Sequence, residues 1–104
     1  MNLPQILIIE DGRALSLALG AAVRQVNACS KIVSTAARAR EHLLAHGANF
    51  AAMILDIGLP DENGLDFLAS LPPACRLPTL VVTAHGEIDN TIAARKLGVS
   101  EFLT

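Results

Sequence analysis

AAMILD at positions 51–56 and IGLPDENG at positions 57–64 decide how this chain folds. The first segment is a short apolar run that ends on a carboxylate, and the second is rich in turn-forming residues. Apolar runs of this length between turn residues are typical of strands buried on both faces, as in parallel sheets. Asp56 then lies at the carboxyl end of its strand, where ligands bind in open α/β sheets. Asp56 is therefore the first candidate functional residue.

Strand and helix patterns alternate along the rest of the chain. We expect further strands at 6–9, 31–34, 79–83 and 99–104, and helices at about 13–27, 36–46, 65–71 and 88–97. This alternation predicts βαβ units with right-handed crossovers and a parallel sheet covered on both faces. The expected organisation is (βα)₄β in one α/β domain.

The apolar faces of two helices can be predicted from residues that recur at helical spacing. For the first helix these residues are Leu15, Leu19, Val23 and Val26, with Ala18 and Ala22 on the same side. For the last helix they are Ile88, Ile92, Ala93 and Leu97. Either Ser34 or Thr35 is placed to cap the second helix, because their hydroxyls accept bonds from helix N-terminal amides.

Composition excludes several classes of function. The net charge of −2 provides no basic surface for nucleic acid. No apolar run approaches the roughly 20 residues that span a bilayer, and the first residues lack the basic start of a signal peptide. Cys29 and Cys75 have no metal-ligand spacing, so we expect plain thiols in a reducing cytoplasm. The sequence thus predicts a cytoplasmic protein that binds neither nucleic acid nor membrane directly.

Acidic residues follow two of the predicted strands. Glu10 and Asp11 come after the first strand and Asp56 after the third, while Thr83 ends the fourth. Because the carboxyl ends of parallel strands meet at one edge, these side chains should converge. Three carboxylates at reduced dielectric must take up protons or bind a cation. Mg²⁺ suits a site of few carboxylates and several waters, and an aspartate can act as a nucleophile toward phosphorus.

With these residues in place, the chain resembles the receiver domain of two-component response regulators over nearly its whole length. The segments that carry the resemblance are 6–11, 54–56, 58–64, 81–84 and 98–104. The resemblance implies a doubly wound, flavodoxin-like parallel sheet with strand order 2-1-3-4-5. It also implies that a sensor histidine kinase transfers a phosphoryl group to Asp56.

The resemblance assigns a metal site to the acidic residues. Asp11 and Asp56 would bind Mg²⁺ directly, Gly58 would contribute its backbone carbonyl, and Glu10 would act through a water molecule. The resemblance thus implies Mg²⁺ as the cofactor, and it implies that the chain accepts a phosphoryl group without catalysing the conversion of a substrate.

The same resemblance assigns a conformational switch. Thr83 would be the hydroxyl that turns toward the phosphoryl group, and Ala84 the small residue that leaves the phosphoryl site open. Phe102 resembles the aromatic residue that changes rotamer when Thr83 moves. The surface formed by residues 84–104 would then control an output domain or a downstream partner.

The sequence departs from the family pattern at its C-terminal end. Receiver domains have a lysine directly after the fifth strand and then a fifth helix, whereas this sequence ends at Thr104. We therefore expect residues 1–104 to be a C-terminally truncated receiver domain without an output domain. Apolar residues that the fifth helix would cover should then favour self-association.

Two alternative functions follow from the same residues. A phosphorylation-impaired interaction module that self-associates is one, because the lysine normally contacts the phosphoryl oxygens. The other is a small Mg²⁺-dependent phosphatase with an aspartyl nucleophile. Such enzymes typically carry a second acid two residues after the nucleophile, where this chain has Gly58.

Overall fold

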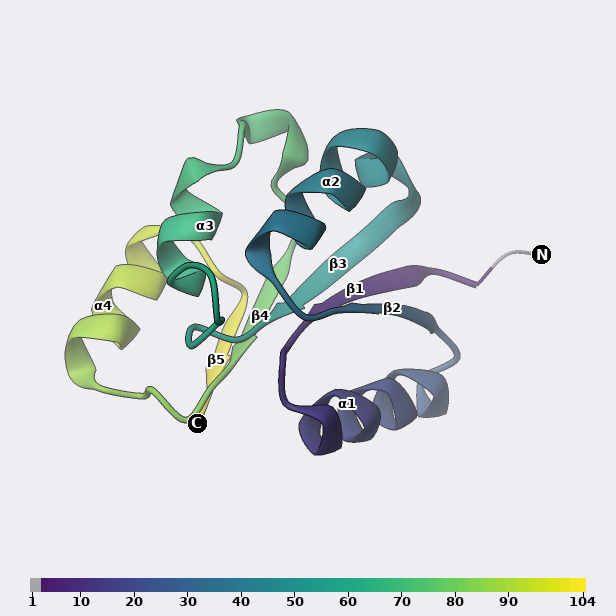
Figure 1. Ribbon diagram of the computed structural model, residues 1–104, viewed down its shortest axis with the longest axis horizontal. Coiled ribbons are helices and arrows are strands. Elements are labelled where there is room, and N and C mark those ends of the chain that lie inside the picture. The colour runs from purple at the N-terminus through teal and green to yellow at the C-terminus, as the bar shows by residue number, and fades with distance from the viewer. Residues whose placement is uncertain (1–2) are drawn as a thin grey trace.

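A computed structural model describes residues 3–104 of the chain. Its helices and strands are β1 (Gln5–Ile9), α1 (Arg13–Gln25), β2 (Cys29–Val33), α2 (Ala36–His46), β3 (Phe50–Leu55), α3 (Gly64–Ser70), β4 (Thr79–Val82), α4 (Ile88–Lys96) and β5 (Glu101–Leu103). Short 3₁₀ turns occupy Gly47–Asn49 and Pro73–Cys75. The strands form one parallel sheet in the order β2-β1-β3-β4-β5 (Figure 1), which confirms the predicted fold.

Helices α2, α3 and α4 lie on one face of the sheet and α1 lies on the opposite face (Figure 1). The main core packs residues of β1 and β3 against α2 and α3. Its centre is made by side chains that are fully buried, among them Leu7, Met53, Leu55 and Phe67. Leu7 pairs with Met53 across β1 and β3, so both side chains point into the same layer. This core fixes the positions of the strands whose ends carry the acidic residues.

The predicted apolar face of α1 is wrong in part. Leu15 is 40% exposed and Val26 is 73% exposed, while the buried positions of the helix are Ser16, Gly20 and Val23. A Cβ atom built on Gly20 would lie at an ordinary contact distance of 3.5 Å from Ser30 Oγ on β2. The helix therefore turns Ser16, Gly20 and Val23 toward the sheet and leaves Leu15 and Val26 exposed.

The predicted apolar face of α4 is also wrong in part. Ile88 is 75% exposed and Ile92 is 48% exposed, whereas Ala94 is fully buried against Ile57 and Val81. At 3.6 residues per turn, Ile88 and Ile92 lie on the side of the helix roughly opposite Ala94. In α4, Ala94 therefore faces the core in place of Ile88 and Ile92.

The prediction that the strand ending at Asp56 is buried on both faces is wrong. On the face toward α1, Ile54 of β3 and Leu80 and Val82 of β4 are only half-buried, and Leu103 of β5 is 48% exposed. The reason is that α1 packs on β1 and β2 and reaches only as far as Ile54. An apolar strip therefore runs across β3, β4 and β5.

Local signals at the helix ends account for the remaining boundaries. Thr35, and not Ser34, caps α2, and its Oγ1 accepts a bond of 3.1 Å from the amide of Arg38. Gly98, at a φ of 78°, follows the last turn of α4 in the left-handed conformation that glycine adopts readily. Among residues 3–104, no helix has the length and apolar character needed to cross a bilayer.

Candidate functional site

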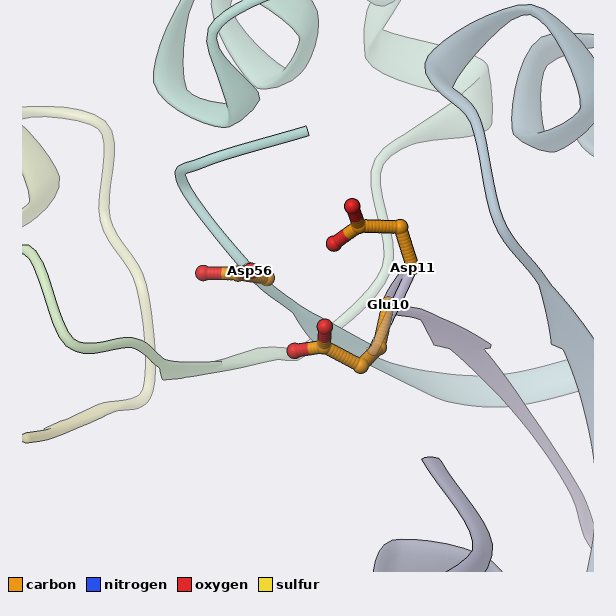
Figure 2. Close-up of side chains that lie close together, drawn as sticks. All are labelled: Glu10, Asp11 and Asp56. Atoms are coloured by element: carbon orange, nitrogen blue, oxygen red, sulfur yellow. The ribbon is translucent and has the colours of Figure 1, made fainter. Parts of the chain in front are cut away.

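Glu10, Asp11 and Asp56 come together at one edge of the sheet. Glu10 and Asp11 directly follow β1 and Asp56 directly follows β3; these strands are neighbours in the sheet. The amide of Asp56 donates a 3.0 Å hydrogen bond to the carbonyl of Ile9, which extends the ladder to the acidic residues. One oxygen from each carboxylate lies within 4.8 Å of the others, and Figure 2 shows the three side chains gathered at the strand ends.

Glu10 is the buried member of the acidic cluster, with an exposed fraction of 6%. Burial raises the pKa of its carboxyl to about 7, and the negative charge of Asp56 contributes in the same direction. The amide of Gly12 donates a 2.7 Å bond to Glu10 Oε2, which opposes the shift without cancelling it. The cluster therefore holds excess negative charge, which a proton or a cation would neutralise.

The donor set of this cluster fits a hard divalent cation. All three side chains offer carboxylate oxygens, the ligands that Mg²⁺ and Mn²⁺ prefer. Asp11 is exposed and Asp56 is half-buried, so water also has access to the site. A site of this kind suits Mg²⁺, which usually keeps several waters and binds one or two carboxylates.

The loop after Asp56 is folded tightly over the end of β3. The amide of Gly58 donates to Asp56 Oδ1 at 3.3 Å, and Gly58 also forms an isolated bridge with Asn63. The amide of Gly64 donates a 2.7 Å bond to the carbonyl of Ile57. A Cβ atom at Gly64 would overlap the carbonyl oxygen of Asp56, so glycine is required where α3 begins. Asp56 and the backbone of Gly58 are thereby held close together.

Thr83, Ala84 and Phe102 lie on the side of the site formed by β4 and β5. Thr83 directly follows β4, the strand beside β3; its side chain is buried, and its Oγ1 accepts a 3.1 Å bond from the amide of His85. Ala84 is exposed in the loop that leads to α4. Phe102 is half-buried and packs with the cluster that contains Val81. Thr83 and Ala84 thus lie in the loop after β4, and Phe102 lies beside Val81 on the neighbouring strand β5.

Two contacts of the site had no signal in the sequence. The His85 ring lies against Gly58, where an added Cβ would be 2.6 Å from Nε2, so this glycine also makes room for a side chain of the next loop. Asp61 reaches the N-terminus of α2, which is 25 residues earlier in the chain. Neither contact follows a local spacing rule, because each joins separate elements of the fold.

Comparison with known proteins agrees with this architecture. Residues 6–104 match the family model described as response regulator receiver domain. The chain is 35% identical over 100 residues to the transcriptional regulatory protein BasR of Escherichia coli K12, a match that covers 95% of this chain and 44% of BasR. It is 29% identical over 99 residues to the KDP operon regulatory protein KdpE of the same organism, again over 95% of this chain and 43% of KdpE. The chain therefore spans less than half the length of these relatives.

Solved structures show the same fold. The non-phosphorylated HemR receiver domain of Leptospira biflexa matches with a TM-score of 0.84 and 29% identity, covering 96% of this chain and 80% of that chain. The Mn²⁺-bound form of the response regulator Rcp1 matches with a TM-score of 0.81 and 28% identity, covering 97% of this chain and 80% of that chain. The similarity extends over essentially all the described residues.

Proposed function

This chain belongs to the family of response regulator receiver domains, and from that membership we propose that Asp56 is its phosphoacceptor. The observation that carries the proposal is the convergence of Glu10, Asp11 and Asp56 at the carboxyl end of the sheet. Receiver domains accept a phosphoryl group and do not turn over a substrate pool. Asp56 belongs to the acidic cluster and is half-buried, so a phosphoryl donor can reach its side chain, which suits this role.

In the proposed reaction, a carboxylate oxygen of Asp56 forms a bond to phosphorus while the bond from phosphorus to the donor atom breaks. The bonding electron pair leaves with the donor, which is a phosphorylated histidine of a sensor kinase. Asp11 and Asp56, with the carbonyl of Gly58 and with Glu10 through water, would hold a Mg²⁺ ion. That ion supplies positive charge, which lowers the repulsion between the carboxylates and the incoming phosphoryl group.

The response to phosphorylation is proposed to pass through Thr83 and Phe102. In this account the hydroxyl of Thr83 leaves its bond with the amide of His85 and turns to a phosphoryl oxygen. Ala84 leaves space beside the phosphoryl group, and Phe102 repacks against α4. Such a change shifts the equilibrium between two forms of the surface formed by residues 84–104.

The partners of the proposed module are a sensor histidine kinase and an output domain or downstream protein. Transcriptional regulators such as BasR and KdpE are the relatives that support control of transcription as the output. We place the module in the cytoplasm, where such kinases phosphorylate their partners. Residues 1–104 would act in it as the receiver unit.

Intact-mass spectrometry after incubation with acetyl phosphate and Mg²⁺ tests the assignment of Asp56. The parent protein is expected to gain one phosphoryl group, and the Asp56→Asn variant none. Asp66→Asn is the matched control, because Asp66 is an exposed acid on α3 outside the cluster. Phosphorylation of Asp56→Asn to the extent of the parent would exclude Asp56 as the acceptor.

A second proposal concerns self-association. The apolar strip formed by Ile54, Leu80, Val82 and Leu103 is covered by α1 only at its edge. Apolar surface that is left partly exposed favours association with a second copy. A phosphorylation-impaired module that self-associates through this strip would show dimers in sedimentation but no phosphoryl adduct, whereas a functional receiver would show the adduct.

A further inference from the structure

The loop that follows Asp56 is tied to the start of α2 by Asp61. Its Oδ1 accepts a 2.9 Å bond from the amide of Ala36, and its Oδ2 accepts a 3.0 Å bond from the amide of Ala37. The first amides of a helix have no partner within the helix, and negative charge is favoured at this end. These bonds lower the pKa of Asp61, so the side chain is ionised at neutral pH. One carboxylate therefore connects two elements that are distant in the sequence.

Glu62, the next residue of the loop, makes a second connection to α2. Its carboxylate forms a two-point ion pair with Arg40, with distances of 2.7 and 2.9 Å. Arg40 also donates a 2.7 Å bond to Ser70 Oγ at the end of α3, and its guanidinium lies 5.1 Å from the ring centre of the buried Phe67. Such two-point pairing fixes the orientation of both partners.

The two connections hold the far end of the loop, while Asp56 holds its near end. Gly58 lies between these anchors, with its amide bonded to Asp56 and its backbone bridged to Asn63. A shift of the loop relative to α2 would therefore move the Gly58 carbonyl relative to the carboxylates. No other hydrogen bond to the side chains of Asp61 and Glu62 is formed within the described residues.

We propose that Asp61, Glu62 and Arg40 form a clamp that positions the acceptor loop for divalent-ion binding and phosphoryl transfer. These are positioning residues, since they act through Gly58 and Asp56 and not on the phosphoryl group. The proposal rests on the proposed function of Asp56 and extends it to α2. In this proposal α2 holds the loop that follows Asp56, and phosphoryl transfer to Asp56 depends on that contact.

A cap that only stabilises α2 would have a different effect, and Thr35 provides the comparison. Thr35 caps the same helix through the amide of Arg38, and among residues 3–104 its side chain forms no hydrogen bond with the loop. Thr35→Ala and Asp61→Ala thus each remove a cap of α2, and only Asp61→Ala releases the loop. Asp61→Asn retains one acceptor oxygen and serves as the conservative variant.

The experiment measures the Mg²⁺ dissociation constant of each variant by titration, and amide hydrogen exchange of residues 57–63 without metal. Asp61→Ala is expected to raise the dissociation constant about tenfold, the lower end of what lost supporting contacts cost a metal site, and to speed exchange in the loop. Thr35→Ala should change neither, and Asp61→Asn should recover part of the affinity. Equal effects of Asp61→Ala and Thr35→Ala on both readouts, or no effect of Asp61→Ala, would overturn the proposal.

A charge exchange tests the ion pair independently of the cap. Arg40→Glu alone should weaken Mg²⁺ binding and loosen the loop, and the combination with Glu62→Arg should restore both. If the double variant recovers neither the Mg²⁺ affinity nor the slow hydrogen exchange of the loop, the ion pair does not position the loop. The hydrogen-exchange measurement requires neither metal nor a phosphoryl donor. If the parent protein is not phosphorylated, the proposed function of Asp56 is refuted, but the exchange data still test whether Asp61, Glu62 and Arg40 hold the loop.

Discussion

Replacing Glu10 by glutamine tests whether the acidic cluster stores unfavourable electrostatic free energy. The substitution preserves the size of the side chain and an oxygen that can accept the bond from the Gly12 amide. It removes only the ionisable group that is buried beside Asp56. We therefore expect Glu10→Gln to stabilise the metal-free protein at alkaline pH.

The size and sign of this effect follow from the pKa of Glu10, which burial raises from 4.5 to about 7. Between these values the folded protein binds more protons than the unfolded chain, so the free energy of unfolding falls as pH rises from 4.5 to 7 and is constant above. At 1.36 kcal/mol per pKa unit, the upper limit of the loss is about 3 kcal/mol. Glu10→Gln should remove this dependence and be about 1–3 kcal/mol more stable than the parent at pH 8.

Urea unfolding in EDTA at pH 4.5 and pH 8 measures the effect. The parent and Glu10→Gln should differ little at pH 4.5 and most at pH 8. Glu41→Gln is the control, because Glu41 is an exposed acid on α2. Addition of Mg²⁺ at pH 8 should stabilise the parent more than Glu10→Gln. Equal stability of the two proteins at pH 8 without metal would refute the reasoning.

Three further substitutions test the packing on which the site depends. Phe67→Ala removes a fully buried ring from the main core and should lower the free energy of unfolding by about 3–5 kcal/mol in urea titration. Gly64→Ala introduces a Cβ where the Asp56 carbonyl lies; we expect a loss of about 1–3 kcal/mol and slower phosphorylation by acetyl phosphate, and unchanged values would contradict the close approach. If the proposed self-association uses the apolar strip, the parent should form dimers in sedimentation velocity and Leu103→Glu, which places a charge on the strip, should not; a monomeric parent, or dimers that persist in Leu103→Glu, would contradict this interface.

The topology and the meeting of the acids could be predicted because both depend on simple periodicities. Alternating strand and helix patterns imply a parallel sheet, and in such a sheet residues that end neighbouring strands must lie at one edge. Asp11 and Asp56 are therefore close in space although 45 positions separate them in the sequence (Figure 2). The preference of hydroxyl residues for helix N-termini likewise restricted the cap of α2 to Ser34 or Thr35, and Thr35 is the cap.

The rotation of the helices could not be predicted from apolar spacing. In α1, Ser16, Gly20 and Val23 are buried while Leu15 is 40% exposed, because the buried face is set by how the helix packs on β1 and β2 and not by apolar spacing alone. The connection between Asp61 and Ala36 was also beyond sequence reasoning, since it depends on how the acceptor loop meets α2 in space. Sequence patterns show where apolar residues line up on a helix, but they do not determine which face of the helix packs against the sheet.

Locating the phosphoryl group on the chain tests the central claim most directly. After reaction with acetyl phosphate and Mg²⁺, borohydride reduction converts an acyl phosphate to an alcohol, and peptide mass spectrometry identifies the changed residue. We expect the modification to map to Asp56 alone and to be abolished by EDTA. Modification of another residue in place of Asp56, or labelling of Asp56 that is independent of divalent ions, would contradict this claim.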